Sequence, residues 1–324
     1  MRLLILITFI LSLSGCSLQE DFDYTSHQEL IVVNGFLHPD SIISIKVSQT
    51  APYPHGNTFN SINHASVKLY ENGRLLSQIP YNQAKQAYVL NYYPKETLSY
   101  RLVVKVANQD SLFATTSIPA NSTSEACYSP FPEGINQRFN GNIKLDINIK
   151  KNDPAAVLWL GLTSKAFAST RIDIPPYTIY DSSSVKTESM TYIYSNSSAI
   201  DRFNGTLDEG LNSYSFVMRL NPAANINDYQ VDAFSFETDK FYTYRKIQNL
   251  PESLGLYVHV YTTSEDFDRY WKTSLLYFLN NHSENDIPNP FAEQIVNYSN
   301  ISNGTGIFAG YNSQTIAVHK TKCR

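Results

Sequence analysis

The chain has 324 residues, a formal net charge of −4 and an aromatic content of 13%. This mildly acidic chain lacks the basic stripe that a phosphate backbone requires, so we expect no nucleic-acid partner. Its 23 tyrosines and 17 phenylalanines, against three methionines, favour β-structure, because aromatic side chains fit the half-buried face of a pleated sheet. The length is sufficient for two domains.

The first residues predict export and lipidation. Arg2 precedes an apolar run over residues 3–13, which is too short for a permanent span of about 20 residues. The pattern predicts a signal peptide over residues 1–15. Leu13-Ser14-Gly15-Cys16 resembles a bacterial lipobox, in which Cys16 is the lipid attachment residue, and two or three acyl chains give a lasting anchor. The alternative is an ordinary cleaved signal followed by a chance cysteine.

Residues 16–28 are predicted to form a lipidated tether. Gln19, Glu20 and Asp21 resemble the signal that sends Bacteroidetes lipoproteins to the outer face of the outer membrane. The alternative is a solvated tether with no address in it. We expect a protein anchored in the outer membrane through its lipid and facing the cell exterior. No later stretch approaches the length of a membrane span.

Two further cysteines, Cys127 and Cys323, form a possible disulfide. An even pair in an oxidising compartment is generally a bridge, and one closing so long a loop would stabilise the fold by about 4–5 kcal/mol. The alternative is that they never meet, because their Cα atoms must come within about 7 Å.

Residues 29–118 predict an immunoglobulin-like β-sandwich. Short apolar runs alternate with turn signals, and about seven strands fit into some ninety residues, which is the spacing of such a sandwich. Ala65, Val67 and Leu69 share one face, and Asn72-Gly73 follows as a hairpin turn.

Residues 119–141 are rich in Pro, Ser, Asn and Gly and predict a linker. Residues 142–324 then predict a larger β-rich domain with one amphipathic helix at about 264–280. Ser264 is its expected N-cap, and its aromatic stripe is expected to pack on its own sheet more readily than on a partner. Asn303-Gly304 predicts a last hairpin, in which residues 307–309 pair with 316–318.

Five segments carry a family resemblance: Val33–Phe36, Ala65–Gly73, Tyr100–Val104, Asn289–Phe291 and Asn303–Gly310. Together, behind a lipobox, they resemble a Bacteroidetes surface lipoprotein family classed as domain of unknown function 4249. Its N-terminal part is similar to the regulatory immunoglobulin-like modules attached to carboxypeptidases and to TonB-dependent receptors. The resemblance implies a gene neighbourhood with such receptors, and it carries over no catalytic residue.

The sequence holds none of the common catalytic or phosphate-binding spacings, so we assign no catalytic, cofactor-binding or metal-binding residue and expect a protein that is not an enzyme. His38, His55 and His64 could meet as metal ligands, although surface histidines are commoner. His259 shares a strand face with Tyr257 and Tyr261, which suits either an aromatic ligand patch or ordinary packing.

These observations predict an accessory subunit of a TonB-dependent nutrient uptake system that captures a glycan, a peptide or a metal chelate. One alternative is a structural or adhesive cell-surface module. Another is a hydrolase whose site is assembled from distant residues. Binding residues are expected in the loops 50–64 and 163–212, because loops on a rigid scaffold carry most binding functions.

Overall fold

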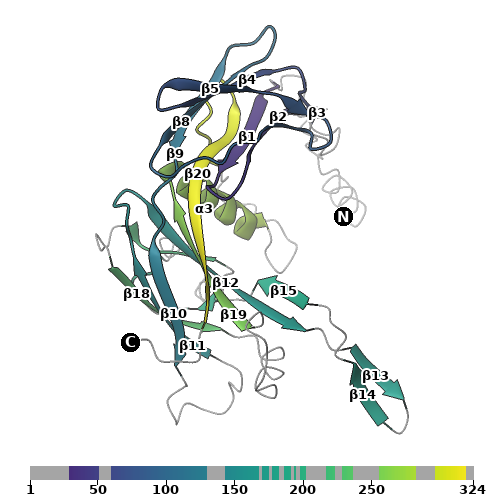
Figure 1. Cartoon of the computed structure of the whole chain (residues 1–324), viewed down its shortest axis with the longest axis vertical. Coiled ribbons are helices and arrows are strands. Elements are labelled where there is room, and N and C mark those ends of the chain that lie inside the picture. The colour runs from purple at the N-terminus through teal and green to yellow at the C-terminus, as the bar shows by residue number, and fades with distance from the viewer. Residues whose placement is uncertain are drawn as a thin grey trace, which may run out of the picture.

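The computed structural model describes residues 29–50, 60–129, 143–167, 170–174, 177–181, 186–190, 193–194, 198–201, 217–222, 228–235, 255–281 and 296–318. The described part is mainly β with a single long helix, so the predicted fold class is confirmed (Figure 1). No described helix is both long and apolar enough to cross a membrane.

The first sandwich consists of two facing sheets. One contains β1 (Ile31–Leu37), β2 (Ile43–Gln49), β3 (Asn60–Ser61), β6 (Tyr81–Asn82) and β7 (Ala87–Leu90). The other has the order β5 (Arg74–Ile79), β4 (Ser66–Glu71), β8 (Ser99–Lys105) and β9 (Leu112–Ser117). Alternate residues point inward, and the core between the sheets includes Val33, Ile45, Leu69 and Leu102. The predicted hairpin is present, with positive φ at Asn72 (47°) and Gly73 (78°).

The second sandwich also pairs two sheets. One contains β12 (Val157–Phe167), β15 (Lys186–Met190), β17 (Val217–Arg219), β19 (Gly255–Thr263) and β20 (Thr305–Ala317). The other has the order β10 (Thr123–Ser129), β11 (Ile143–Lys150), β18 (Asp228–Ser235) and β16 (Ile193–Tyr194). A separate hairpin is formed by β13 (Thr170–Ile174) and β14 (Tyr177–Asp181). The core between the sheets includes Leu145, Ile147, Leu160 and Val260.

The helix α3 (Glu265–Asn281) covers the other face of the large sheet (Figure 1). Ser264 caps it as predicted, since the amide of Phe267 donates to Ser264 Oγ at 3.3 Å. Trp271 stacks on Trp159 of β12, with 4.8 Å between ring centroids, and meets the ring of Tyr261 edge-on at 5.2 Å. The aromatic stripe therefore packs on its own sheet.

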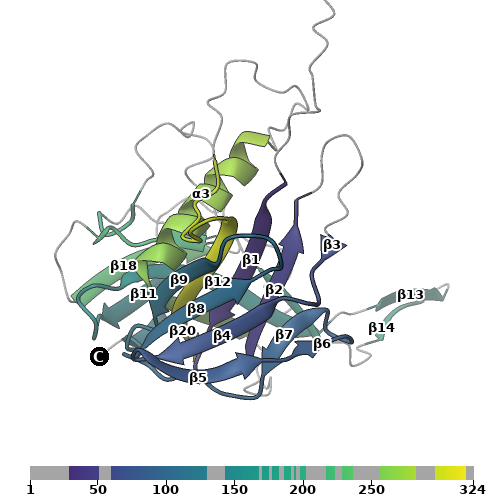
Figure 2. The same ribbon diagram turned by 90° about the horizontal axis from the view of Figure 1, so that it is seen from above.

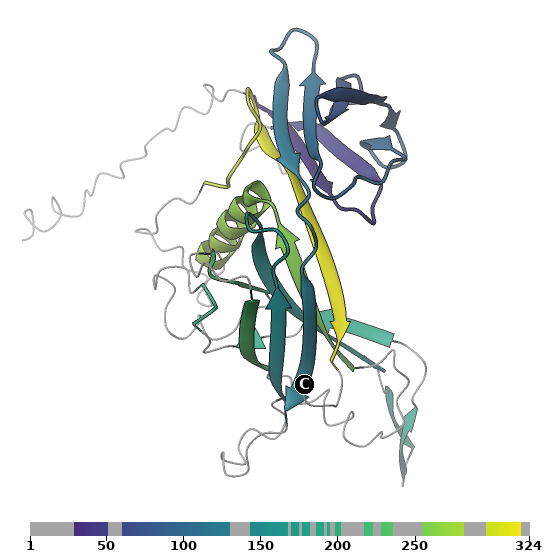
Figure 3. The ribbon, with the colours of Figure 1, turned by 60° about the vertical axis from the view of Figure 1, so that its left-hand side comes forward.

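The strand β20 belongs to both sandwiches (Figure 3). Its first half runs parallel to β1, from the pair Val32–Thr305 to the pair Leu37–Gly310. Its second half runs antiparallel to β19, from Thr263–Tyr311 to Tyr257–Ala317. One continuous hydrogen-bonded sheet thus extends through both sandwiches.

The prediction of a last hairpin was therefore wrong, because residues 305–317 form one strand. The glycines that suggested a turn serve close approach instead. A Cβ on Gly306 would lie 2.2 Å from the carbonyl oxygen of Val33, and one on Gly310 would lie 2.3 Å from that of Ser117. Only glycine allows β20 to insert between β1 and β9 in this way.

Two predicted domain limits also need correction. Residues 123–129 of the predicted linker form β10, an ordered strand paired with β11, in which the small side chains of Ala126 and Cys127 are buried. The first sandwich, predicted over 29–118, is completed by the distant segment 301–310, since Ile301 and Phe308 lie in its core. Both segments pair with distant parts of the chain, so local composition does not reveal where they belong.

Candidate functional site

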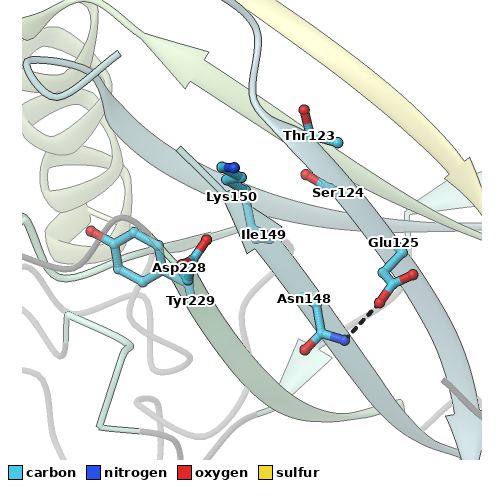
Figure 4. A pocket seen from close by; sticks show the side chains of 8 residues that line it. All are labelled: Thr123, Ser124, Glu125, Asn148, Ile149, Lys150, Asp228 and Tyr229. Carbon is cyan, nitrogen blue, oxygen red and sulfur yellow. Dashed lines mark hydrogen bonds between the residues drawn. The ribbon is translucent and has the colours of Figure 1, made fainter. Parts of the chain in front are cut away.

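The second sandwich carries a pocket of 620 Å³ across three neighbouring strands (Figure 4). Strand register places its residues in rows: Thr123, Lys150 and Asp228 lie side by side, as do Ser124, Ile149 and Tyr229. A third row brings Glu125 beside Asn148, whose side-chain amide donates to Glu125 Oε1 at 3.1 Å. We call this site the β10–β11–β18 pocket.

The pocket offers hydrogen-bond donors and acceptors of both charges. Lys150, Asp228 and Glu125 are exposed, whereas Ile149 and Tyr229 are buried and close the pocket from within. Burial raises the pKa of the Tyr229 hydroxyl, which therefore stays protonated at neutral pH and donates to the carbonyl oxygen of Asn221 at 3.4 Å. Such a lining can bind a hydroxyl-rich or zwitterionic ligand.

A buried ion-pair network lies beneath α3. Arg219 donates to both carboxylate oxygens of Asp268, at 2.7 and 2.6 Å, and also pairs with Asp201. Trp159 Nε1 donates to Asp268 Oδ1 at 2.9 Å. Burial alone would lower the pKa of Arg219, but the hydrogen bonds and charges of Asp268 and Asp201 outweigh it and raise this pKa. The carboxylate of Asp268 is therefore engaged in fixing the helix, and we assign it no ligand.

His38 lies where the two sandwiches meet. Its Nδ1 accepts from the amide of Asp40 at 3.1 Å, so Nε2 carries the proton and donates to Ser313 Oγ at 2.9 Å. The ring lies 4.8 Å from the ring of Tyr311, and desolvation lowers the pKa of His38. Aromatic rings also meet at this boundary, since the ring centroids of Phe36 of β1 and Phe267 of α3 are 5.4 Å apart.

The three histidines that could have met as metal ligands do not form a cluster among the described residues. His38 faces Ser313, while His64 lies next to Asn63 Oδ1 at 3.3 Å, and His55 is outside the described residues. Among the described residues, no three His, Cys, Asp or Glu side chains are grouped so that they could hold a metal ion.

His259 and Tyr261 of β19 have different surroundings. His259 hydrogen-bonds to Thr163 at 2.7 Å and to Thr315 at 3.0 Å, which links three strands. Tyr261 is covered by Trp271 of α3, so this part of the predicted patch is packing.

Several predicted site residues lie outside the described residues: Cys16, Gln19, Glu20, Asp21 and Cys323. Lipid attachment and the export signal therefore stay predictions. Cys127 is disulfide-bonded and its partner lies outside the described residues, so the pairing with Cys323 also stays a prediction. Residues 51–59 and most of 168–216, where binding loops are expected, are likewise not described.

Sequence patterns revealed neither the pocket nor the network. Glu125 fell within the predicted linker, and Asp228 and Lys150 are far apart in the sequence and meet only through strand pairing. A signal for the network did exist. Arg219 is flanked by Met218 and Leu220, and a lone arginine in an apolar strand requires a buried partner.

Comparison with known proteins finds one matching family. The model of the family "Domain of unknown function (DUF4249)" matches residues 19–317. No curated protein matches the chain. Among solved structures, the crystal structure of the collagen adhesin CNA from S. aureus shares 8% identity over 89% of this chain and 95% of that chain, with a TM-score of 0.19. A TM-score this low carries no argument about fold or function. Because the family model spans nearly the whole sequence, this protein belongs to the DUF4249 family.

Proposed function

We propose that this protein is an outer-membrane surface lipoprotein that acts as a non-catalytic accessory subunit of a TonB-dependent nutrient uptake system. In this role it holds a polar ligand in the β10–β11–β18 pocket. Three features of the sequence support this localisation: the signal peptide, the lipobox at Cys16 and the acidic residues that follow it.

The observation that carries the proposal is the sharing of β20 by both sandwiches. Glu29, where the tether enters, precedes β1 in the first sandwich, whereas the pocket lies in the second. Rotation of one sandwich against the other would break ladder hydrogen bonds of β20, each worth about 1 kcal/mol. A subunit that presents a ligand to a receptor benefits from such a fixed geometry, because pre-organisation lowers the entropy cost of binding.

The lining of the pocket favours a glycan or a short peptide as ligand. Asp228 and Glu125 can accept hydrogen bonds from sugar hydroxyls or ammonium groups, and Lys150 can pair with a carboxylate. An apolar ligand would use none of these donors and acceptors, so a hydroxyl-rich or zwitterionic ligand fits them better.

The partner is tested by a tagged pull-down from detergent-solubilised outer membranes of the native organism, followed by mass spectrometry. We expect a stoichiometric TonB-dependent receptor in the eluate. Recovery of the lipoprotein alone, under conditions that keep known receptor complexes intact, would contradict the proposal and favour a structural or adhesive role.

The pocket is tested separately with Lys150→Ala combined with Asp228→Ala. We expect this variant to keep its receptor and to lose binding to glycan and peptide arrays that the wild-type protein recognises. The matched control is Lys46→Ala combined with Asp110→Asn, which changes the same kinds of charge on the first sandwich. Equal binding by both variants would exclude the pocket as the ligand site.

A further inference from the structure

The outward face of the sheet β5-β4-β8-β9 carries positive charge and exposed apolar side chains. Alternation along the strands places inward residues such as Leu69 and Leu102 in the core and the residues between them outside. The outward set, which we call the basic face, contains Lys68, Tyr70, Leu75, Arg101, Lys105 and Phe113. Figure 2 views this end of the molecule, with no other strand or helix drawn in front of β4, β5 and β8.

The charge of this face is opposite to that of the whole protein. Three cationic side chains, Lys68, Arg101 and Lys105, stand on this face. The fourth cation of these strands, Arg74, is the cross-strand partner of the single carboxylate, Glu71, and shares its side of the sheet. Glu71 lies on the inner side of the sheet, where its Oε1 accepts from Tyr92 at 2.5 Å and from the buried Tyr100 at 2.9 Å. The chain as a whole has a formal charge of −4.

The exposed apolar side chains lie among these cations. Leu75 is 56% exposed and Phe113 is 41% exposed, and the guanidinium carbon of Arg101 lies 5.5 Å from the centroid of the Phe113 ring. Cross-strand pairing places Tyr70 beside both Leu75 and Arg101. Surfaces that lie on a lipid interface typically combine aromatic and aliphatic side chains with surrounding cations. The apolar groups enter the headgroup region, and the cations pair with phosphates.

The tether enters the molecule at the edge of this face. Glu29 and Leu30 line one cavity together with Lys105, Asn108 and Asn303. The residues 16–28 that precede Glu29 reach at most about 45 Å when fully extended. A chain anchored at Cys16 therefore keeps the basic face close to the lipid surface, where the effective concentration of headgroups is high.

We propose that the basic face lies on the membrane surface and binds anionic, phosphate-bearing lipid headgroups. This inference rests on the lipid anchor of the proposed function and adds the orientation of the protein. The sheet lies at one end of the molecule and the second sandwich at the other (Figure 1), so the β10–β11–β18 pocket belongs to the sandwich that is farther from the membrane. The guanidinium of Arg101 pairs with a phosphate, and Phe113 and Leu75 enter the headgroup layer.

The test measures vesicle binding by the chain from residue 17 to 324, which keeps every described element and lacks the lipid. The vesicles are phosphatidylcholine with about 30% phosphatidylglycerol, and pure phosphatidylcholine serves as reference. We expect cosedimentation with the anionic vesicles at about 0.1 M salt and its loss at about 0.5 M, because salt screens surface charge. Lys68→Ala with Arg101→Ala should lower the partition coefficient about 25-fold, at about fivefold per cation.

The control is Lys46→Ala on the outward face of β2, which removes one cation from the other sheet and should leave the partition coefficient unchanged, whereas Lys68→Ala alone should lower it about fivefold. Phe113→Ser should lower the partition coefficient and make the remaining binding easier to abolish with salt. The proposal is overturned if anionic vesicles do not bind the chain, or if the double variant binds them as well as the control. It is also overturned if the double variant loses only its co-purifying receptor, since the face would then dock a protein. Vesicle binding is measured without a receptor, so failure of the receptor pull-down does not affect it.

Discussion

Arg219 and Asp268 face each other with two hydrogen bonds, at 2.7 and 2.6 Å, in a buried position beneath α3. They are 8% and 3% exposed, and they lie on different elements, β17 and α3. This pair therefore holds the helix against the second sandwich. A separate contact, between Phe36 and Phe267, joins the helix to the first sandwich.

Asp268→Ala should lower the free energy of unfolding by about 3–5 kcal/mol, because it leaves the guanidinium of Arg219 buried without its main counter-ion. Urea unfolding followed by tryptophan fluorescence measures the change, since Trp159 also loses a hydrogen bond. The control is Glu265→Ala on the same helix, whose pair with Arg269 is exposed and whose loss should have no measurable effect. Equal stability of the two variants would mean that the buried pair contributes nothing.

Gly306→Ala should destabilise the protein by about 2–6 kcal/mol, since it combines backbone strain with a steric clash. Gly306 has a φ of 109°, and its Cβ would lie 2.2 Å from the carbonyl oxygen of Val33. Gly73→Ala is a suitable control, because Gly73 also has a positive φ of 78° but has no atom within 4 Å of its Cβ. A thermal melt in which both variants lose the same stability would show that close approach at Gly306 is unimportant.

His38 should make the protein less stable as the pH falls below about 6.5. Its pKa is lowered in the folded state, so the unfolded chain binds more protons in this range and stability rises with pH. The effect is complete above the unfolded pKa and diminishes from there towards the lower folded pKa. Asp40 opposes the shift, and the desolvation outweighs it.

Urea midpoints measured between pH 5.5 and 7.5 test this expectation. The variant His38→Gln should flatten the dependence on pH, while His64→Gln, at an exposed position of the same sandwich, should leave it unchanged. If the midpoint of wild-type protein did not vary over this range, the buried neutral imidazole would not be linked to folding.

Local patterns predicted much of this fold, and long-range pairing accounts for what they missed. The alternation in residues 65–69, the turn at Asn72-Gly73 and the cap at Ser264 depend on neighbours in the sequence, and each is present in the structure. The course of β20 depends on contacts with β1 and β19, which are distant in the sequence. Asn303-Gly304-Thr305-Gly306 therefore suggested a turn, although its glycines serve a crowded strand junction.

The candidate site was less predictable than the fold for the same reason. The residues of the pocket have no characteristic spacing and become neighbours only when β10, β11 and β18 pair. The basic face could be predicted in part, because Lys68, Arg101 and Lys105 alternate with buried residues within single strands. Its proximity to the tether could not, since the β8–β9 turn and Asn303 meet Glu29 only in the folded chain.

The disulfide of Cys127 allows a prediction that also identifies its partner. Cys127 lies on β10 with 5% exposure and is disulfide-bonded. Its replacement by serine should lower the free energy of unfolding by about 2–5 kcal/mol, because the unfolded chain regains entropy and a buried position becomes polar. Non-reducing peptide mapping of the mature protein should recover the peptide containing Cys127 joined to that containing Cys323. If Cys323→Ser left the stability and the Cys127 bridge intact, the C-terminal cysteine would not be the partner, and the chain end would not be tied to the second sandwich.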